Sequence, residues 1–393
     1  MTEVPTTVAE RNTHGGSTAA AGTALPNASR VARGRSVRDT QVFNQADRFV
    51  EGWHWLLPSR ELKREQLKAV RLLGRELVVY RGKNGHVHAA DAYCPHMGAH
   101  LAEGRVEGNH LRCFFHNWRF DEQGQCQEAP GTQKTPGACL QTWPVREHYG
   151  LIWLWTGDAP KGELPFVPEL RDEEVDVKLG NRFVKACHPN VVLINAIDEN
   201  HFNSVHNLPV DLYMETRVHD ENVVQFSNRT QVPSSNLFTR AIGQFYEGPL
   251  TYSMCYHYAS SGSVTVGPDL MHFHIMFALR LIENGEAEGQ TILLTKRRHG
   301  KRGRGFNRIA LEATRLVGDY FAKGDTQVFQ TMNFDFKTPT KADHAIVDFI
   351  QHTERQKTRR FGDWSVLDPM SEMPQEGGEA KAAFERKLEV LHG

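Results

Sequence analysis

Apolar positions between residues 53 and 156 fall into short runs, and turn residues separate these runs. Alternation of apolar and polar positions over about 4–8 residues is typical of half-buried β-strands, and a short wholly apolar run is typical of a buried strand. Lys83-Asn84-Gly85 adds a hairpin signal between two of the runs. The strands that this pattern predicts cover residues 67–72, 76–81, 86–91 and 151–155. We therefore expect a compact antiparallel β domain here, over residues 50–158.

A proline-rich linker over residues 160–168 precedes a longer region in which helical and strand-like patterns are mixed. The elements that these patterns predict are helices over 191–206, 308–332 and 343–358, with strands within 223–282 and over 291–296. The mixture predicts an α+β domain over residues 165–370.

The two ends of the chain lie outside these regions. Residues 1–40 contain no aromatic residue and are rich in Ala, Thr, Gly and Ser, so they cannot bury enough apolar surface to offset the entropy of ordering. We predict a disordered tail there. Five arginines leave a targeting peptide as the alternative, although the apolar centre of a secretory signal is missing. Residues 371–393 are predicted to form a C-terminal helix or tail.

Composition narrows the class of protein. The 393 residues carry 46 Lys and Arg against 47 Asp and Glu, and this balance argues against a protein that binds nucleic acid through a general positive charge. The sequence contains no run of about 18 apolar residues, so we expect no membrane span. Six scattered cysteines are too few for a disulfide framework, so we expect a cytoplasmic protein. Twenty histidines raise the question of metal binding, because imidazole is the commonest metal ligand.

Two of the histidines and two of the cysteines form two mixed pairs in the β domain. Cys94 and His96 form the first, and Cys113 and His116 follow after sixteen intervening residues. A tetrahedral zinc ion would accept two thiolates and two imidazoles, but zinc sites usually pair cysteine with cysteine and histidine with histidine. One cysteine and one histidine per pair suits a [2Fe–2S] cluster in which both cysteines hold one iron and both histidines hold the other.

A second group of candidate ligands lies in the α+β domain. Two histidines and one carboxylate hold non-haem Fe(II) and leave positions open for O2, and His201 and His206 are candidates for the two histidines. They lie about 140° apart on a regular helix, so both reach one metal only if the helix bulges or ends between them. Pro209, which follows closely, favours an ending. Asp198 is placed to hydrogen-bond a ligand imidazole, Glu199 and Asn200 are expected to face solvent, and Asn195 is a candidate neighbour of the metal.

The third ligand has to come from far along the chain, and Asp319, Asp325 and Asp335 are the candidates. Asp325 shares a helix face with Phe321, Val328 and Phe329, whereas Asp319 points away from that face. A carboxylate on an apolar face is costly unless it is paired or bound to a metal. We therefore favour Asp325, with a helix N-cap or surface aspartate as the alternative.

The two motifs together resemble those of Rieske non-haem iron oxygenases, in particular the terminal oxygenase (α) component. The resemblance covers about residues 53–358, with C-x-H and C-x2-H at 94–116 and N-x2-D-x2-H-x4-H at 195–206. Residues 324–329 resemble the carboxylate segment of the ketosteroid-hydroxylase type, and residues 94–125 resemble the aminopyrrolnitrin-oxygenase type. Respiratory Rieske proteins carry additional loop cysteines, and this chain has Ala99 and Phe114 in those regions.

The resemblance implies a fold, a set of cofactors and a set of partners. It implies an antiparallel β Rieske domain followed by a helix-flanked antiparallel sheet of the START or helix-grip kind. The implied cofactors are a Rieske [2Fe–2S] cluster on Cys94, His96, Cys113 and His116, and Fe(II) on His201, His206 and Asp325. O2 is the implied co-substrate, and NAD(P)H supplies electrons through a reductase, with or without a ferredoxin. Asp198 would link the iron to the cluster of a neighbouring subunit, which implies a homotrimer.

Substrate and reaction stay open at this point. The implied substrate is a small, hydrophobic or aromatic molecule. Hydroxylation, demethylation, N-oxygenation, desaturation and oxidative cyclisation by a mono- or dioxygenase all suit the same iron site. The main alternative is a Rieske electron-transfer or redox-sensing protein without oxygenase activity, and a zinc-stabilised binding protein is a second. The basic segment 296–304 is predicted to be a solvated loop, or else a surface that attracts an acidic electron donor.

Overall fold

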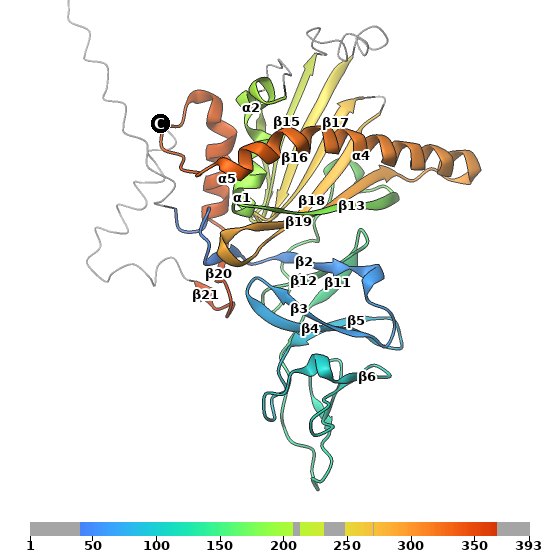
Figure 1. Ribbon diagram of the computed structural model, residues 1–393. Helices are drawn as coiled ribbons and strands as arrows, with labels where there is room; N and C mark the ends of the chain where they lie inside the picture. The colour runs from blue at the N-terminus through green and yellow to red at the C-terminus, as the bar shows by residue number, and fades with distance from the viewer. Residues whose placement is uncertain (1–39, 207–212, 232–247, 270, 368–393) are drawn as a thin grey trace, which may run out of the picture. The chain divides into compact units, whose positions relative to one another are not determined.

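The computed structural model describes residues 40–206, 213–231, 248–269 and 271–367 (Figure 1). The predicted tail before Thr40 and the predicted C-terminal helix or tail lie outside these residues. No helix within the described ranges is long and apolar enough to cross a membrane.

Short antiparallel strands make up the first part of the chain, as the sequence predicts. Their bounds are β1 (Arg48–Val50), β2 (Trp53–Pro58), β3 (Leu67–Leu72), β4 (Arg75–Arg81), β5 (Val87–Asp91), β6 (Arg105–Glu107), β7 (His110–Arg112), β8 (Arg119–Phe120), β9 (Cys126–Glu128), β10 (Thr142–Trp143), β11 (Val145–His148) and β12 (Leu151–Trp155). They form sheets of order β10-β5-β4-β3, β11-β12-β2 and β6-β7-β8-β9. The predicted strands at 67–72 and 151–155 coincide with β3 and β12. The wholly apolar β12 is buried along its entire length, because β11 and β2 flank it.

One seven-stranded antiparallel sheet dominates the second part of the chain. Its strands are β13 (Val175–Lys185), β14 (Glu215–Asp220), β15 (Val223–Gln231), β16 (Pro249–His257), β17 (Ser261–Pro268), β18 (Phe273–Leu281) and β19 (Ala287–Lys296), in the order β13-β19-β18-β17-β16-β15-β14. Strands β14 to β19 follow one another as a meander, and β13 closes the far edge by pairing with β19. The predicted α+β class is confirmed.

Helices flank this sheet. They are α1 (Pro189–Ile194), α2 (Glu199–Ser204), the long α4 (Gly300–Thr331) and α5 (His344–Glu354), and a 3-10 turn over Asn195–Ile197 lies between the first two. Helix α4 contacts β13, β18 and β19, and its orange ribbon runs across the sheet in Figure 1. It begins earlier than the predicted residue 308, so half of the basic segment is helical rather than a loop. The Arg298 guanidinium lies 4.3 Å from the centroid of the Phe306 ring and stabilises this additional turn.

The predicted helix over 343–358 is too long at its C-terminal end. It ends at Glu354, and Thr358 starts β20 (Thr358–Arg360), which pairs with β1 and with β21 (Val366–Leu367). Trp364, just before β21, packs edge-on against Trp143 of β10. The end of the described chain therefore packs into the core of the first β region, far from its neighbours in sequence.

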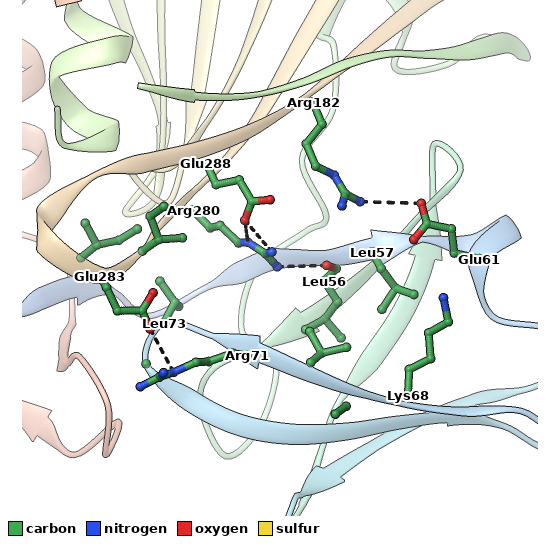
Figure 2. Close-up of a pocket in the computed structure, with 15 residues that line it drawn as sticks. Leu56, Leu57, Glu61, Lys68, Arg71, Leu73, Arg182, Arg280, Glu283 and Glu288 are labelled. Carbon is green, nitrogen blue, oxygen red and sulfur yellow. Dashed lines mark hydrogen bonds and ion pairs between the residues drawn. The ribbon is translucent and has the colours of Figure 1, made fainter. Parts of the chain in front are cut away.

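A cavity of about 480 Å³ lies between strands β2 and β3 on one side and strands β18 and β19 on the other (Figure 2). The Arg280 side chain lies within it: the guanidinium stands 4.2 Å from the centroid of the Trp55 ring, donates to Glu288 at 2.6 Å and donates to the Leu56 carbonyl at 3.0 Å. Paired charges line this cavity, and no predicted metal ligand does. Residues of both the first and the second part of the chain line this cavity, and it is not the candidate site.

Candidate metal centres and their cavity

Each half of the cluster motif forms a tight loop that one backbone hydrogen bond closes. The N–H groups of Cys94 and Cys113 each donate to the carbonyl five residues later, both at 2.9 Å. Four residues after each cysteine the backbone turns through positive φ, at Gly98 (71°) and Asn117 (53°). Glycine and asparagine are the residues that adopt this conformation most readily. The two loops therefore have the same construction, and each presents one cysteine and one histidine.

The thiols and the imidazoles of these loops differ in exposure. Cys94 and Cys113 are buried, whereas His96 is exposed and His116 is half-buried. The two imidazole rings lie edge to face, with centroids 4.6 Å apart, and the Trp118 ring stacks on His96 at 4.2 Å. This arrangement fits a group with one end buried against thiolates and the other end near the surface against imidazoles.

The zinc alternative fits this geometry poorly. Around one tetrahedral zinc ion all four ligand atoms lie roughly 3–4 Å apart. Within the part of the chain that the structure describes, no three of these four ligand atoms lie within 4.8 Å of one another. Burial raises the pKa of the Cys94 thiol to about 11, so a thiolate at this position needs a cation beside it. The four residues fit a group that spans two metal ions better than a single ion.

The helix predicted over residues 191–206 is wrong as a single element, and its interruption builds the second site. Asp198 is extended (φ −81°, ψ 105°) and separates the 3-10 turn from α2. Its Oδ1 atom caps α2 by accepting from the N–H groups of Asn200 at 3.0 Å and His201 at 3.2 Å. Helix α2 then ends at Ser204, so His206 follows the helix and is free of the regular helical angle. The ending that the sequence favours is present.

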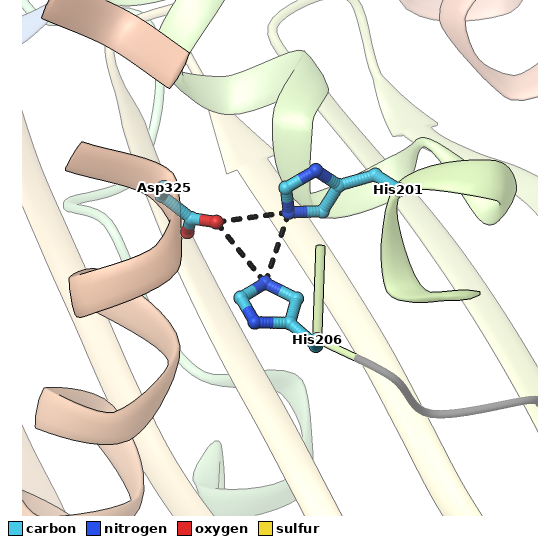
Figure 3. Close-up of side chains that lie close together, drawn as sticks. All are labelled: His201, His206 and Asp325. Atoms are coloured by element: carbon cyan, nitrogen blue, oxygen red, sulfur yellow. Dashed lines mark hydrogen bonds and ion pairs between the residues drawn. The ribbon is translucent and has the colours of Figure 1, made fainter. Parts of the chain in front are cut away.

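Three side chains meet beyond this helix end (Figure 3). The Nε2 atoms of His201 and His206 are 2.9 Å apart, and Oδ1 of Asp325 lies 2.9 Å from the first and 3.0 Å from the second. With bonds of roughly 2.1 Å, ligands at right angles lie about 3.0 Å apart and tetrahedral ligands about 3.4 Å apart. The three atoms thus have the spacing of one face of an octahedron, which is the arrangement expected of two histidines and one carboxylate around Fe(II).

Of the three candidate aspartates, Asp325 alone among the described residues reaches both histidines. Asp319 pairs with Arg315 at 2.8 Å, and Asp335 pairs with Lys337 at 2.8 Å. Burial raises the pKa of the Asp325 carboxyl, but hydrogen bonds from the two imidazoles lower it further, to about 2. The carboxylate is therefore charged at neutral pH, as a metal ligand has to be.

Three neighbours of the triad support it, and sequence reasoning found only one of them. The Nδ2 atom of Asn195, which the sequence analysis places near the metal, lies 3.1 Å from Nε2 of His201. The Tyr320 hydroxyl donates to the carbonyl of His206 at 3.4 Å. Gly324 lets α4 pass close to His206, because a Cβ atom there would lie 3.0 Å from Val205 and 3.3 Å from Cε1 of His206. A glycine one position before a candidate ligand is the available sequence signal.

Replacing Gly324 by alanine is expected to lower Fe(II) affinity by roughly 10-fold, since changes that disturb the support of a metal-bound histidine typically cost this much or more. The new methyl group would push α4 and His206 apart. Gly305 on the same helix is the matched control, because nothing lies within 4 Å of a Cβ atom there. Titration of the iron-depleted protein with Fe(II) measures both variants, and equal affinities would contradict the role of Gly324.

The acids beside the histidines differ from expectation in two ways. The described contacts of Asp198 are with backbone N–H groups, and none is with an imidazole of its own chain. Glu199, expected to face solvent, is mostly buried: its Oε1 accepts from the N–H of Met214 at 3.1 Å and lies 3.8 Å from Nδ1 of His344. The physical reason is a long-range contact, which the local pattern around α2 does not show. Asn200 is exposed, as predicted.

An apolar cavity of about 270 Å³ adjoins the triad. Tyr252, Met254 and Phe277 are among the side chains that line it. Tyr256 belongs to the core instead, and its hydroxyl donates to the Leu193 carbonyl at 2.6 Å. The triad therefore stands in the wall of a space that suits a small apolar molecule.

The basic segment 296–304 is partly neutralised within the chain. Lys296 pairs with Glu173, and Arg297 donates to Asp176 at 2.7 Å. These pairs reduce the charge that the segment presents to a partner, so its predicted role in attracting an electron donor gains no support from the structure.

A comparison with protein-family models identifies the β domain that contains the cluster motif. The model of the Rieske [2Fe-2S] domain matches residues 52–144, which include all four predicted cluster ligands. The chain contains a Rieske domain. The expected Rieske class is thereby confirmed for this part of the chain.

Several proteins that are similar to the chain carry the names of oxygenase components, and another, 39% identical over 163 residues, is a cholesterol 7-desaturase of Bombyx mori. It is 36% identical over 177 residues to a probable 3-ketosteroid-9-alpha-monooxygenase, oxygenase component, of Rhodococcus rhodochrous, which covers 43% of this chain and 44% of that protein. It is 32% identical over 198 residues to aminopyrrolnitrin oxygenase PrnD of Pseudomonas fluorescens, covering 47% and 53%. The matches span only about half the length of these relatives. Both are of the types that the sequence motifs resemble, so the predicted resemblance to these oxygenase components is confirmed over the matched part of the chain.

The fold extends the likeness beyond the Rieske domain. The crystal structure of dicamba monooxygenase bound to dicamba superimposes with a TM-score of 0.57 at 20% identity, covering 80% of this chain and 97% of that one. At such low identity the match shows a shared fold and nothing about substrate. Dicamba monooxygenase thus shares the helix-flanked antiparallel sheet that follows the Rieske domain in this chain.

Proposed function

We propose that the chain is the terminal component of a Rieske non-haem iron oxygenase, which oxidises a small apolar organic substrate with O2. One observation carries the proposal: in a chain with a Rieske domain, His201, His206 and Asp325 meet at the spacing of a facial triad beside an apolar cavity. A redox sensor or electron carrier would need neither the triad nor the cavity.

The residues have separate tasks. When bound, the cluster supplies single electrons, and Fe(II) supplies open coordination positions for O2. Cys94, His96, Cys113 and His116 hold the cluster. The imidazoles of the triad would hold the second metal, and Asp325 would contribute one negative charge to it. The apolar wall orients the substrate and keeps water from the site.

Electrons have to pass between the two centres, and we assign Asp198 to this passage. Within the described residues, no hydrogen bond, ion pair or ring contact joins a cluster ligand to His201, His206 or Asp325 in the same chain. Asp198 keeps one carboxylate oxygen on the α2 backbone, and its second oxygen has no hydrogen-bond partner among the described residues. This arrangement supports a bridge to a Rieske histidine of another subunit, within a homotrimer.

The exposed end of the Rieske domain supports contacts with partners. Met97, Phe114 and Phe115 expose from about half to two thirds of their surface beside the two histidines. Large apolar side chains grouped at the surface usually mark an interaction site. We propose that this end meets the neighbouring subunit, and that a ferredoxin or an NAD(P)H reductase delivers electrons to the same cluster.

The experiment that tests the function combines the full-length protein with NADH, a reductase, labelled O2 and mixtures of small apolar metabolites. Substrate-dependent NADH oxidation with a label in the product is expected. NADH consumption that no mixture stimulates, with no labelled product, would contradict the oxygenase and favour the electron-transfer alternative. Hydroxylation, demethylation, N-oxygenation and oxidative cyclisation are distinguished by the product.

A further inference from the structure

Most of the wall of the cavity beside the triad is apolar. Its walls come from both sides of the space between the sheet and α4, and they include Val192, Met254, Val266, Ile275, Leu293 and Phe321. At the mouth, Arg315 and Asp319 neutralise each other through a hydrogen bond of 2.8 Å. Lys185, the last residue of β13, is the other lining cation among the described residues.

The Lys185 ammonium reaches across from the sheet to the helix. It donates to Oγ1 of Thr326 at 2.6 Å, one residue after the candidate ligand Asp325. The centroids of the Phe183 and Phe329 rings lie 5.8 and 5.6 Å from it. Hydrogen bonding and the ring faces hold the ammonium in place, so it is a fixed feature of the cavity and not a solvated surface charge.

The environment of Lys185 leaves part of its charge uncompensated. In the described part of the chain, no carboxylate oxygen lies within 4.0 Å of its ammonium. An ammonium has three N–H donors, and Thr326 accepts from one of them. Burial lowers the pKa of Lys185, while the more distant Asp325 raises it. A cation that is partly desolvated without a paired anion gains most from a ligand that brings the anion with it.

On the basis of the proposed oxygenase function, we propose that Lys185 is a specificity-determining residue that selects apolar substrates bearing one acidic group, such as a carboxylate. The carboxylate accepts from the two remaining N–H donors. The apolar body of the substrate fills the cavity between β18 and α4. A neutral carbonyl would accept one hydrogen bond but would leave the charge of the ammonium uncompensated. The anion is therefore the favoured partner.

Two probes of nearly the same shape test the assignment. 2-Naphthoate carries the acid, and 2-naphthamide replaces it with a neutral amide that still accepts hydrogen bonds. Isothermal titration of the metal-loaded protein is expected to show 2-naphthoate binding at least about 10-fold more tightly, because hydrogen bonds to charged groups contribute this much or more. Lys185→Met should abolish the preference by weakening the acid much more than the amide, and Lys185→Arg should retain part of the preference.

The control is Lys178→Met, the same substitution on the same strand. The Lys178 ammonium pairs with Glu312 and does not line this cavity, so this variant should keep the preference. If Lys185 only tethered β13 to α4, its replacement would weaken both probes equally. Binding of the acid to the metal would survive in Lys185→Met, so a preference that persists there overturns the proposal. Failure of wild-type protein to bind 2-naphthoate at millimolar concentration overturns it as well.

The same titration separates this inference from the function on which it rests. A protein that incorporates labelled O2 into a product yet binds both probes equally contradicts only the role of Lys185. A protein that prefers the acid through Lys185 but never consumes O2 has the binding site and lacks the proposed activity.

Discussion

Replacement of His206 by alanine is expected to remove one iron per chain and to leave the visible spectrum of the Rieske cluster unchanged. Among the described residues, three protein ligand atoms meet at this point, and His206 supplies one of them. The remaining pair, His201 and Asp325, would bind Fe(II) weakly. Substrate oxidation should fall by more than about 100-fold, since even the partners of metal ligands contribute 10- to 100-fold. Iron analysis, absorption spectroscopy and product formation measure the three effects.

His299→Ala is the matched control, because this histidine is largely exposed at the start of α4 and lies far from the triad in sequence. It should retain its iron, its cluster and its activity. If the His206 variant instead kept full iron content and activity, the triad would not be the second metal site.

Replacement of Asp198 by asparagine is expected to lower turnover by about 10- to 100-fold or more while both metal centres stay loaded. Alanine would also remove the cap of α2, which is worth about 1 kcal/mol and could displace His201. Asparagine still offers an oxygen to the N–H groups of Asn200 and His201, so the cap survives and only the charge is lost. The rate at which O2 and substrate reoxidise the chemically reduced cluster measures the electron passage directly.

Glu199→Gln controls for this change. It makes the same substitution at the neighbouring acid, and the amide oxygen can still accept from Met214. Normal reoxidation is expected there. Normal reoxidation in Asp198→Asn would limit Asp198 to capping α2 and would remove its role between subunits.

The cluster motif could be predicted because its information is local. Each cysteine and histidine pair falls within one loop of six residues, and the residue that turns the loop, Gly98 or Asn117, is in the same segment. Sequence spacing therefore reports spatial proximity directly. The structure adds the contrast between buried thiols and exposed imidazoles, which spacing alone does not contain.

At the second site, helical periodicity predicts one ligand but not the break in the helix. Helical phase selects Asp325 correctly as the aspartate that faces the histidines, because Phe321 and Phe329 mark the buried face. The same helical periodicity predicts one helix over 191–206, because a single extended residue does not interrupt the apolar pattern. The signal available was Asp198 followed by Glu199, a pair typical of a helix start.

The sequence does not predict contacts between segments that are far apart along the chain. Gly324 matters because Val205 and His206 approach it, and Lys185 matters because β13 closes the edge of the sheet beside α4. Along β16, Tyr252 and Tyr256 share one face of the strand, yet one lines the cavity and the other lies in the core. Alternation identifies the face and not what covers it.

The ratio of iron to acid-labile sulfide in the purified protein tests the central claim most directly. A Rieske cluster and a mononuclear site together predict about three irons and two sulfides per chain, falling to about two irons in His206→Ala with sulfide unchanged. Two irons and two sulfides in wild-type protein after incubation with Fe(II), with no change in the variant, would contradict the oxygenase and leave an electron-transfer protein.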